Sequence, residues 1–217
     1  MPVLTTKFPV RIIPSIASAD QLALREEILR LEDSPFLHID IEDGTFIPNI
    51  TFGLKTIRAV ASCSRAELDA HLMIANPGDF IEPLRACGVK RICVHIEPLS
   101  FPARIIEMIR AAGMVPGLAL AMKTPVDLLL PYQEKISYAL FLTSEPDGEE
   151  KFNPYALEKL RKARELLPSS VSIWVDGGVT NELLSAVIQN GADTVIMGRT
   201  IWQSPNPKEY LEKMQAL

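Results

Sequence analysis

The stretch FLHIDIED (residues 36–43) alternates apolar side chains with polar ones. This period of two predicts a β-strand, because successive side chains of a strand point to opposite faces. A solvated strand face usually carries residues such as Lys, Thr or Ser, but this face carries His38, Asp40 and Glu42. An Asp–Gly turn at 43–44 ends the segment. The strand therefore combines a regular fold signal with residue types that do chemistry.

Seven other segments rich in Ile and Val are predicted as strands, and each is followed by a helical pattern. They cover residues 11–19, 67–74, 91–97, 115–121, 138–144, 171–178 and 194–200, and helices are expected near 20–32, 53–62, 77–87 and 153–167. Such alternation predicts a parallel sheet. Eight units in about 200 residues fit an α/β fold of the (β/α)8 TIM barrel type, as a single domain over residues 1–217. A doubly wound open sheet is the alternative, weakened because no GxGxxG follows the first strand.

Composition narrows the class of protein. Hydrophobic residues make up 47% of the 217 residues, which allows a large core, and the formal net charge is −5. A mildly acidic chain without a basic cluster is not expected to bind nucleic acid. We expect no membrane span and no signal peptide, because long apolar runs are absent. The three cysteines suit reduced thiols in a cytoplasmic protein.

All three histidines of the chain, His38, His71 and His95, fall within three consecutive predicted strands, and His71 and His95 lie in the later half of theirs. Catalytic residues of (β/α)8 barrels sit at the C-terminal ends of the strands. Imidazoles beside carboxylates predict a site for one divalent ion such as Zn, Fe, Mn or Co, although a single buried histidine is usually a satisfied core residue. The residues alone leave the ligands open among His38, Asp40, Asp69, His71, His95 and Asp176. Asp69 could equally support a ligand or end a solvated strand.

Two glycine turns follow the last two predicted strands, in VDGGV (175–179) and MGRT (197–200). Loops at these places in a (β/α)8 barrel often bind phosphate through backbone N–H groups, and glycine permits the close approach. The sequence therefore predicts a phosphate site beside the metal site.

With these residues in view, the chain resembles the ribulose-phosphate 3-epimerase family along nearly its whole length. IIPSIASAD (12–20) is similar to the family's PSxxSAD, and LHIDIEDGTFIPNITFG (37–53) to its HxDxMDGxFVPNxTxG. DAHLM (69–73) matches DxHLM, and VDGGV with GADTVIMGRTIW (191–202) matches the closing pair of motifs. Order and spacing agree throughout.

The resemblance implies an isomerase of carbohydrate metabolism on a ribulose-phosphate binding barrel. It implies that His38, Asp40, His71 and Asp176 hold the metal ion, that Asp40 and Asp176 are the acid–base pair, and that His95 is not a ligand. Substrate contacts would come from Ser15, His71, Gly177, Gly178, Gly198 and Arg199. The expected reaction inverts carbon 3 of a small-molecule ketose phosphate, by default D-ribulose 5-phosphate, through an enediolate. A homo-oligomer is also expected.

The chain departs from the family chiefly at the substrate end. Glu42 replaces a methionine beside the site, Leu142 replaces another, and Arg199 replaces a small residue. The loop TSEPDGEEKF (143–152) is acidic and keeps only Gly148 of a glycine-rich family segment. An epimerase for a hexulose or tetrulose phosphate, or an inactive sugar-phosphate-binding paralogue, is therefore an alternative. A decarboxylase or lyase is a further one, weakened because the strand ends place no lysine in the predicted cluster.

Overall fold

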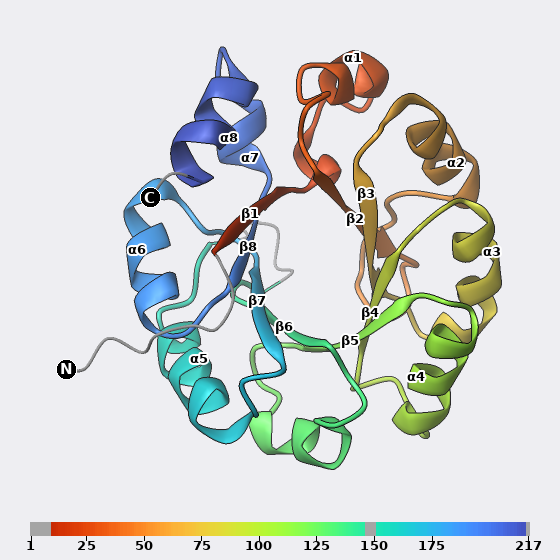
Figure 1. The fold of residues 1–217 in the computed structure, drawn as a ribbon, viewed down its shortest axis with the longest axis vertical. Helices are drawn as coiled ribbons and strands as arrows, with labels where there is room; N and C mark the ends of the chain where they lie inside the picture. Colours follow the sequence, from red (N-terminus) through yellow and green to blue (C-terminus); the bar gives the residue numbers. More distant parts are fainter. Residues whose placement is uncertain (1–9, 146–150, 216–217) are drawn as a thin grey trace.

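The computed structural model describes residues 10–145 and 151–215, and eight parallel strands within them form one sheet in the order β1-β8-β7-β6-β5-β4-β3-β2. A parallel bridge between Ser15 and His38 joins β1 to β2, so the sheet curves into a nearly closed barrel (Figure 1). The strands are β1 (Arg11–Pro14), β2 (Phe36–Glu42), β3 (Glu67–Met73), β4 (Arg91–His95), β5 (Val115–Leu120), β6 (Tyr138–Leu142), β7 (Ser172–Asp176) and β8 (Thr194–Met197). The predicted (β/α)8 barrel is confirmed.

Helices surround the barrel, one or more after each strand (Figure 1). They are η1 (Ile16–Ser18), α1 (Leu24–Leu29), α2 (Leu54–Cys63), η2 (Pro77–Phe80), α3 (Ile81–Ala86), α4 (Pro102–Ala111), η3 (Val126–Tyr132), α5 (Tyr155–Leu166), α6 (Asn181–Gln189), α7 (Arg199–Trp202) and α8 (Pro207–Gln215). The strand predicted over 11–19 was too long, because the Ser15 side chain caps η1 by accepting from the Ala17 N–H. The helix expected near 20–32 is shorter in the structure, where α1 covers only Leu24–Leu29. The fifth unit has a 3₁₀ helix that contains Pro131, a residue that disfavours a continuous α-helix.

The inside of the barrel is filled by side chains, as expected for this fold. Tyr138 and Trp174 stack there with ring centroids 4.3 Å apart. Gly117 on β5 faces the Tyr138 ring, and a Cβ on this glycine would lie 2.5–2.8 Å from three atoms of that ring. A large aromatic residue therefore occupies the barrel interior because its neighbour has no side chain.

Three further expectations from the sequence concern membrane spans, cysteines and the loop 143–152. Among residues 10–145 and 151–215, no helix has the length and apolar character needed to cross a membrane. Cys63, Cys87 and Cys93 are free thiols. Residues 146–150, with Gly148 and three of the loop's acidic residues, lie outside the described residues, so whether loop 143–152 closes over a ligand stays a prediction.

Candidate active site

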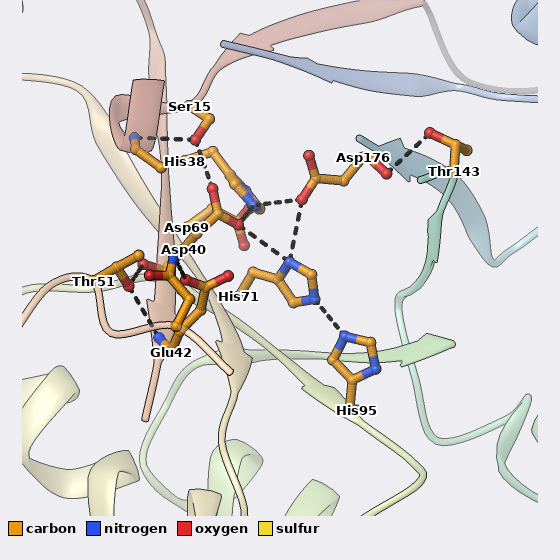
Figure 2. Close-up of polar contacts among 12 residues, drawn as sticks. Ser15, His38, Asp40, Glu42, Thr51, Asp69, His71, His95, Thr143 and Asp176 are labelled. Atoms are coloured by element: carbon orange, nitrogen blue, oxygen red, sulfur yellow. Dashed lines mark hydrogen bonds and ion pairs between the residues drawn. The ribbon is translucent and has the colours of Figure 1, made fainter. Parts of the chain in front are cut away.

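Two histidines and two aspartates from three strands of the barrel converge on one point (Figure 2). His38 and Asp40 come from β2, His71 from β3, and Asp176 ends β7. Each offers one ligand atom, and these four atoms lie within 4.8 Å of one another. His38 and His71 are fully buried and Asp40 is 7% exposed. The structure therefore brings together the four residues that the resemblance pointed to.

His38 is held from behind by a buried carboxylate. Its Nδ1 lies 2.6 Å from Asp69 Oδ2, and its Nε2 lies 3.1 Å from Asp40 Oδ1. The Tyr138 hydroxyl donates to the other Asp69 oxygen at 3.0 Å. Because an ionised carboxylate only accepts hydrogen bonds, His38 Nδ1 carries the hydrogen and Nε2 faces the cluster. Asp69 therefore supports a histidine of the cluster and is not itself a member of it.

His71 faces both aspartates with its other nitrogen. Its Nδ1 lies 3.3 Å from Asp40 Oδ1 and 3.3 Å from Asp176 Oδ2. Ser15 lies across the bridge between β1 and β2 and donates its hydroxyl to Asp40 Oδ2 at 2.6 Å. Ser15 also lines the cavity described below, and its expected contact with substrate stays a prediction.

The cluster carries strongly coupled charges. Burial would lower the pKa of His38, but Asp40 and Asp69 outweigh it and raise that pKa well above its ordinary value. Burial likewise would raise the pKa of Asp40, but His38 and His71 hold it well below its ordinary value. Burial is also outweighed at His71, whose pKa is raised by Asp176 and Asp40. Protons and a metal ion would compete for the same imidazole nitrogens.

A second pair of residues, His95 and Glu97, continues from the cluster toward β5. His71 Nε2 lies 2.9 Å from His95 Nε2, and His95 Nδ1 lies 2.9 Å from Glu97 Oε2 (Figure 2 shows the His71–His95 contact). Burial lowers the pKa of His95 to about 4, so this imidazole is neutral at pH 7. Burial opposes ionisation of Glu97, but His95 and other donors lower its pKa to about 2.

Sequence reasoning missed Glu97. It stands two residues after His95 in the sequence, at the same spacing as Asp40 after His38, although β4 ends at His95 and Glu97 lies in the turn that follows. That spacing was the available signal. His95 itself is a hydrogen-bond partner of His71 in the cluster, and its expected role outside the ligand set stays a prediction.

A cavity of about 870 Å³ opens above the cluster. Asp40 and Asp176 lie in its wall, together with the glycine turns expected to bind phosphate: Gly177, Gly178, Gly198 and the neighbouring Arg199. Gly177 and Gly178 have φ angles of +109° and +68°, which glycine adopts without strain. Side-chain oxygens of Ser144 and Ser18 occupy the space that a Cβ on Gly177 or Gly198 would need. Backbone alone fits at these two turns.

The family departures lie in the same cavity. Glu42 and Glu145 line it, as do Leu142 and Arg199. Asn49 Nδ2 donates to Glu42 Oε2 at 2.6 Å, and the Glu42 backbone N–H donates to the Thr51 hydroxyl at 3.0 Å. The carboxylate of Glu42 is therefore fixed in the cavity wall.

Two histidines and two carboxylates lie below a cavity of this (β/α)8 barrel, an arrangement typical of barrel enzymes, whose active sites lie at the C-terminal face. Comparison with known proteins identifies the enzyme family. The model of the ribulose-phosphate 3 epimerase family matches residues 11–202, and the chain belongs to this family. It is therefore an epimerase, a member of the isomerase class.

Curated relatives cover almost the whole chain. The cytoplasmic isoform of ribulose-phosphate 3-epimerase from Oryza sativa subsp. japonica is 35% identical over 212 residues, which are 94% of this chain and 92% of the relative. Ribulose-phosphate 3-epimerase from Helicobacter pylori is 32% identical, over 95% of this chain and 97% of the relative. Identity of this extent over full length supports the same fold and motif order.

Solved structures agree on the fold alone. A mutant tryptophan synthase α-subunit from Pyrococcus furiosus has a TM-score of 0.70 at 17% identity, over 97% of this chain and 98% of that one. Orotidine 5′-phosphate decarboxylase from Pyrococcus horikoshii has a TM-score of 0.69 at 14% identity, over 94% and 97% of the two chains. At this identity the likeness extends to the barrel and carries no argument about the reaction.

Proposed function

We propose that the chain is a metal-dependent epimerase that inverts carbon 3 of a ketose phosphate, with D-ribulose 5-phosphate and D-xylulose 5-phosphate as the default pair. The observation that carries the proposal is the convergence of His38, Asp40, His71 and Asp176 below the cavity. The curated relatives are named for this reaction, which supports the default substrate.

The distances within the cluster fit one divalent ion. Ligand atoms about 2.1 Å from an ion in a tetrahedron lie about 3.4 Å from one another. His38 Nε2 lies 3.1 Å from Asp40 Oδ1 and 3.7 Å from Asp176 Oδ2. His71 Nδ1 lies 3.3 Å from the same two oxygens. Two imidazoles and two carboxylates suit Zn, Fe, Mn or Co, among which this donor set does not discriminate.

In the proposed mechanism the carboxylates move the proton. A bound divalent ion would supply stabilisation of the negative charge that develops when the proton next to the ketose carbonyl leaves. Asp40 and Asp176 extend from β2 and β7, so they reach the substrate from different strands of the barrel. One takes the proton from carbon 3 and the other returns a proton from the far side, which inverts that carbon. Ser15, by donating to Asp40 Oδ2, orients one of the two bases.

The phosphate would rest on the glycine turns after β7 and β8. Gly177 and Gly198 present backbone where a side chain has no room, and Gly178 has a φ angle of +68° that favours glycine. Arg199 adds a charge-assisted contact. Glu42 and Glu145 in the same cavity favour a second candidate, an epimerase for a hexulose or tetrulose phosphate, because carboxylates could accept hydrogen bonds from additional or differently placed hydroxyls.

Solvent isotope exchange tests the reaction. The metal-loaded protein, incubated in D₂O with D-ribulose 5-phosphate and separately with hexulose and tetrulose phosphates, should place deuterium at carbon 3 of its true substrate. Asp40→Asn and Asp176→Asn should each lower turnover by several orders of magnitude, because both carry the proton. Asp33→Asn, which neutralises an exposed carboxylate paired with Lys208, is the control and should keep wild-type turnover. Epimerisation without deuterium at carbon 3 would refute the mechanism.

We also propose that the chain acts as a homo-oligomer in the cytoplasm. Leu22, Ile50 and Phe101 expose 101%, 77% and 74% of their surface, and a contact between copies would cover such apolar side chains. The three free thiols suit a reducing compartment. Light scattering of the purified protein measures the subunit number directly, and a monomer at all concentrations would contradict the proposal.

A further inference from the structure

A hydrogen-bonded chain leads from the metal cluster to a fixed backbone group. It runs from His71 through His95 to Glu97, with N–N and N–O distances of 2.9 Å at both steps. Glu97 Oε1 accepts from the Ala121 backbone N–H at 2.7 Å and from the Thr124 hydroxyl at 2.5 Å. His95 is fully buried, so each of its polar atoms depends on these partners.

The hydrogen bonds between these three side chains can point in one direction only. The ionised Glu97 carboxylate cannot donate, so His95 Nδ1 carries the hydrogen that it shares with Oε2. A neutral imidazole has a single N–H, so His95 Nε2 accepts. Its partner, His71 Nε2, must then donate, so that a neutral His71, the form that binds a metal ion, has its lone pair on Nδ1. That nitrogen is the one that faces Asp40 and Asp176.

We infer that Glu97 and His95 are positioning residues that fix the hydrogen of His71 on Nε2 and so present its Nδ1 lone pair to the metal site. The inference rests on the proposed metal-dependent function, because only an ion needs that lone pair. Carboxylates that hydrogen-bond to ligand histidines contribute to metal affinity because they fix the tautomer and orientation of the ring and raise its basicity. Here the carboxylate acts through a second imidazole.

Glu97→Gln is the informative substitution, because the site dictates how a glutamine would sit. The Ala121 N–H is backbone and cannot turn, so the amide oxygen must occupy the Oε1 position. The amide NH₂ then faces His95 Nδ1 and donates to it. His95 must in turn donate from Nε2, His71 Nε2 must accept, and the His71 hydrogen moves to Nδ1, against the metal site. A nearly isosteric change thereby reverses the direction of both hydrogen bonds, the one from residue 97 to His95 and the one from His95 to His71.

The first measurement is the nitrogen NMR spectrum of the ¹⁵N-histidine-labelled, zinc-loaded wild-type protein. The chain has only three histidines, so six ring nitrogens account for the spectrum. We expect His95 to carry its hydrogen on Nδ1 and His71 on Nε2. A His95 hydrogen on Nε2 would overturn the inference, and this result needs no variant to fold.

The second measurement is the Kd for zinc, obtained by competition with a chelator. Glu97→Gln should weaken zinc binding by about 10- to 100-fold, the usual effect of an outer partner. His95→Phe should do the same while it keeps the Glu97 charge and the ring packing on His71. The double variant should bind zinc as His95→Phe does, because both changes break one chain. Glu107→Gln removes an exposed charge on α4 and should leave the Kd unchanged.

The outcomes separate the possible failures. If Glu97→Gln weakens zinc binding by the same factor with and without His95→Phe, Glu97 acts by its charge and the inference is wrong. Unchanged Kd in both single variants would also refute it. Wild-type protein that binds no zinc, manganese or cobalt at all would instead refute the metal site of the proposed function.

Discussion

Gly117→Ala tests how the packing inside the barrel supports the site. Gly117 on β5 faces Tyr138, and a Cβ there would lie 2.5–2.8 Å from three atoms of the tyrosine ring. The ring is 2% exposed, stacks on Trp174 and donates its hydroxyl to Asp69 at 3.0 Å. A cavity of about 140 Å³ borders the ring, so an added Cβ either overpacks the site or displaces the ring at the expense of the Asp69 hydrogen bond.

The magnitude follows from these two costs. Overpacking a buried site costs about 1–3 kcal/mol. A hydrogen bond to a charged group contributes about 1.5–3 kcal/mol. If both costs apply in full, the free energy of unfolding should fall by about 2.5–6 kcal/mol. For a chain of this size, each kcal/mol lowers the Tm by about 2–4 °C.

Urea denaturation with calorimetry measures the effect. Gly53→Ala is the matched control, because a Cβ there meets no described atom within 4 Å, and it should change stability by at most about 1 kcal/mol. In a Tyr138→Leu background the clash is removed, so the cost of Gly117→Ala should largely disappear. If Gly117→Ala changed stability by less than about 0.5 kcal/mol, or cost the same in both backgrounds, the packing argument would be wrong.

Three further predictions concern the site itself. Arg199→Ser should raise the KM for the sugar phosphate by about 10- to 100-fold with a smaller loss of kcat, because one charge-assisted contact contributes about 1.5–3 kcal/mol. Steady-state kinetics with an unphosphorylated ketose should show little effect of the same substitution. Asp69→Asn should weaken zinc binding less than Glu97→Gln, by no more than about tenfold in chelator competition, because its amide can turn its oxygen to His38 and its NH₂ to the Tyr138 oxygen. The raised pKa of His38 implies that its contribution to the stability of the metal-free protein is complete below pH 6.5 and is lost as pH rises through the raised value. Zinc affinity should increase over the same rise in pH, because the imidazole must lose its proton to bind the ion. Denaturation and zinc titrations at several pH values measure both dependences.

The barrel could be predicted because its signals are local. Each strand has a run of apolar residues because it is buried in the sheet. In helices such as α4 and α5 the apolar residues recur with the period of an α-helix. The strand ends could not be placed as well. The strand expected over 11–19 stops at Pro14, where a serine side chain forms a turn, and η3 replaces an α-helix around Pro131. Such capping and proline effects depend on single residues inside a longer periodic pattern.

The site was predictable as a set of residue types but not as a set of roles. Spacing placed His38, Asp40, Asp69 and His71 on two neighbouring strands, yet it did not separate ligand from support. The family resemblance made that choice, and the structure places Asp69 behind His38. Glu97 was overlooked because it lies in the turn after β4 and its other anchors, Ala121 and Thr124, are in the connection after β5.

Strand register explains the division of roles. On β2, His38 stands two residues before Asp40, about 6.6 Å deeper in the barrel, so it reaches the cluster with Nε2, its far nitrogen, and leaves Nδ1 for Asp69. His71 pairs in register with Asp40, so its near nitrogen Nδ1 reaches the cluster and Nε2 turns to His95. Asp69 pairs with His38 at the deeper position, where a short side chain supports the imidazole but lies outside the cluster. Equivalent residue types thus become members of the cluster or supports of it according to depth and side-chain length, which only the register of β2 against β3 reveals.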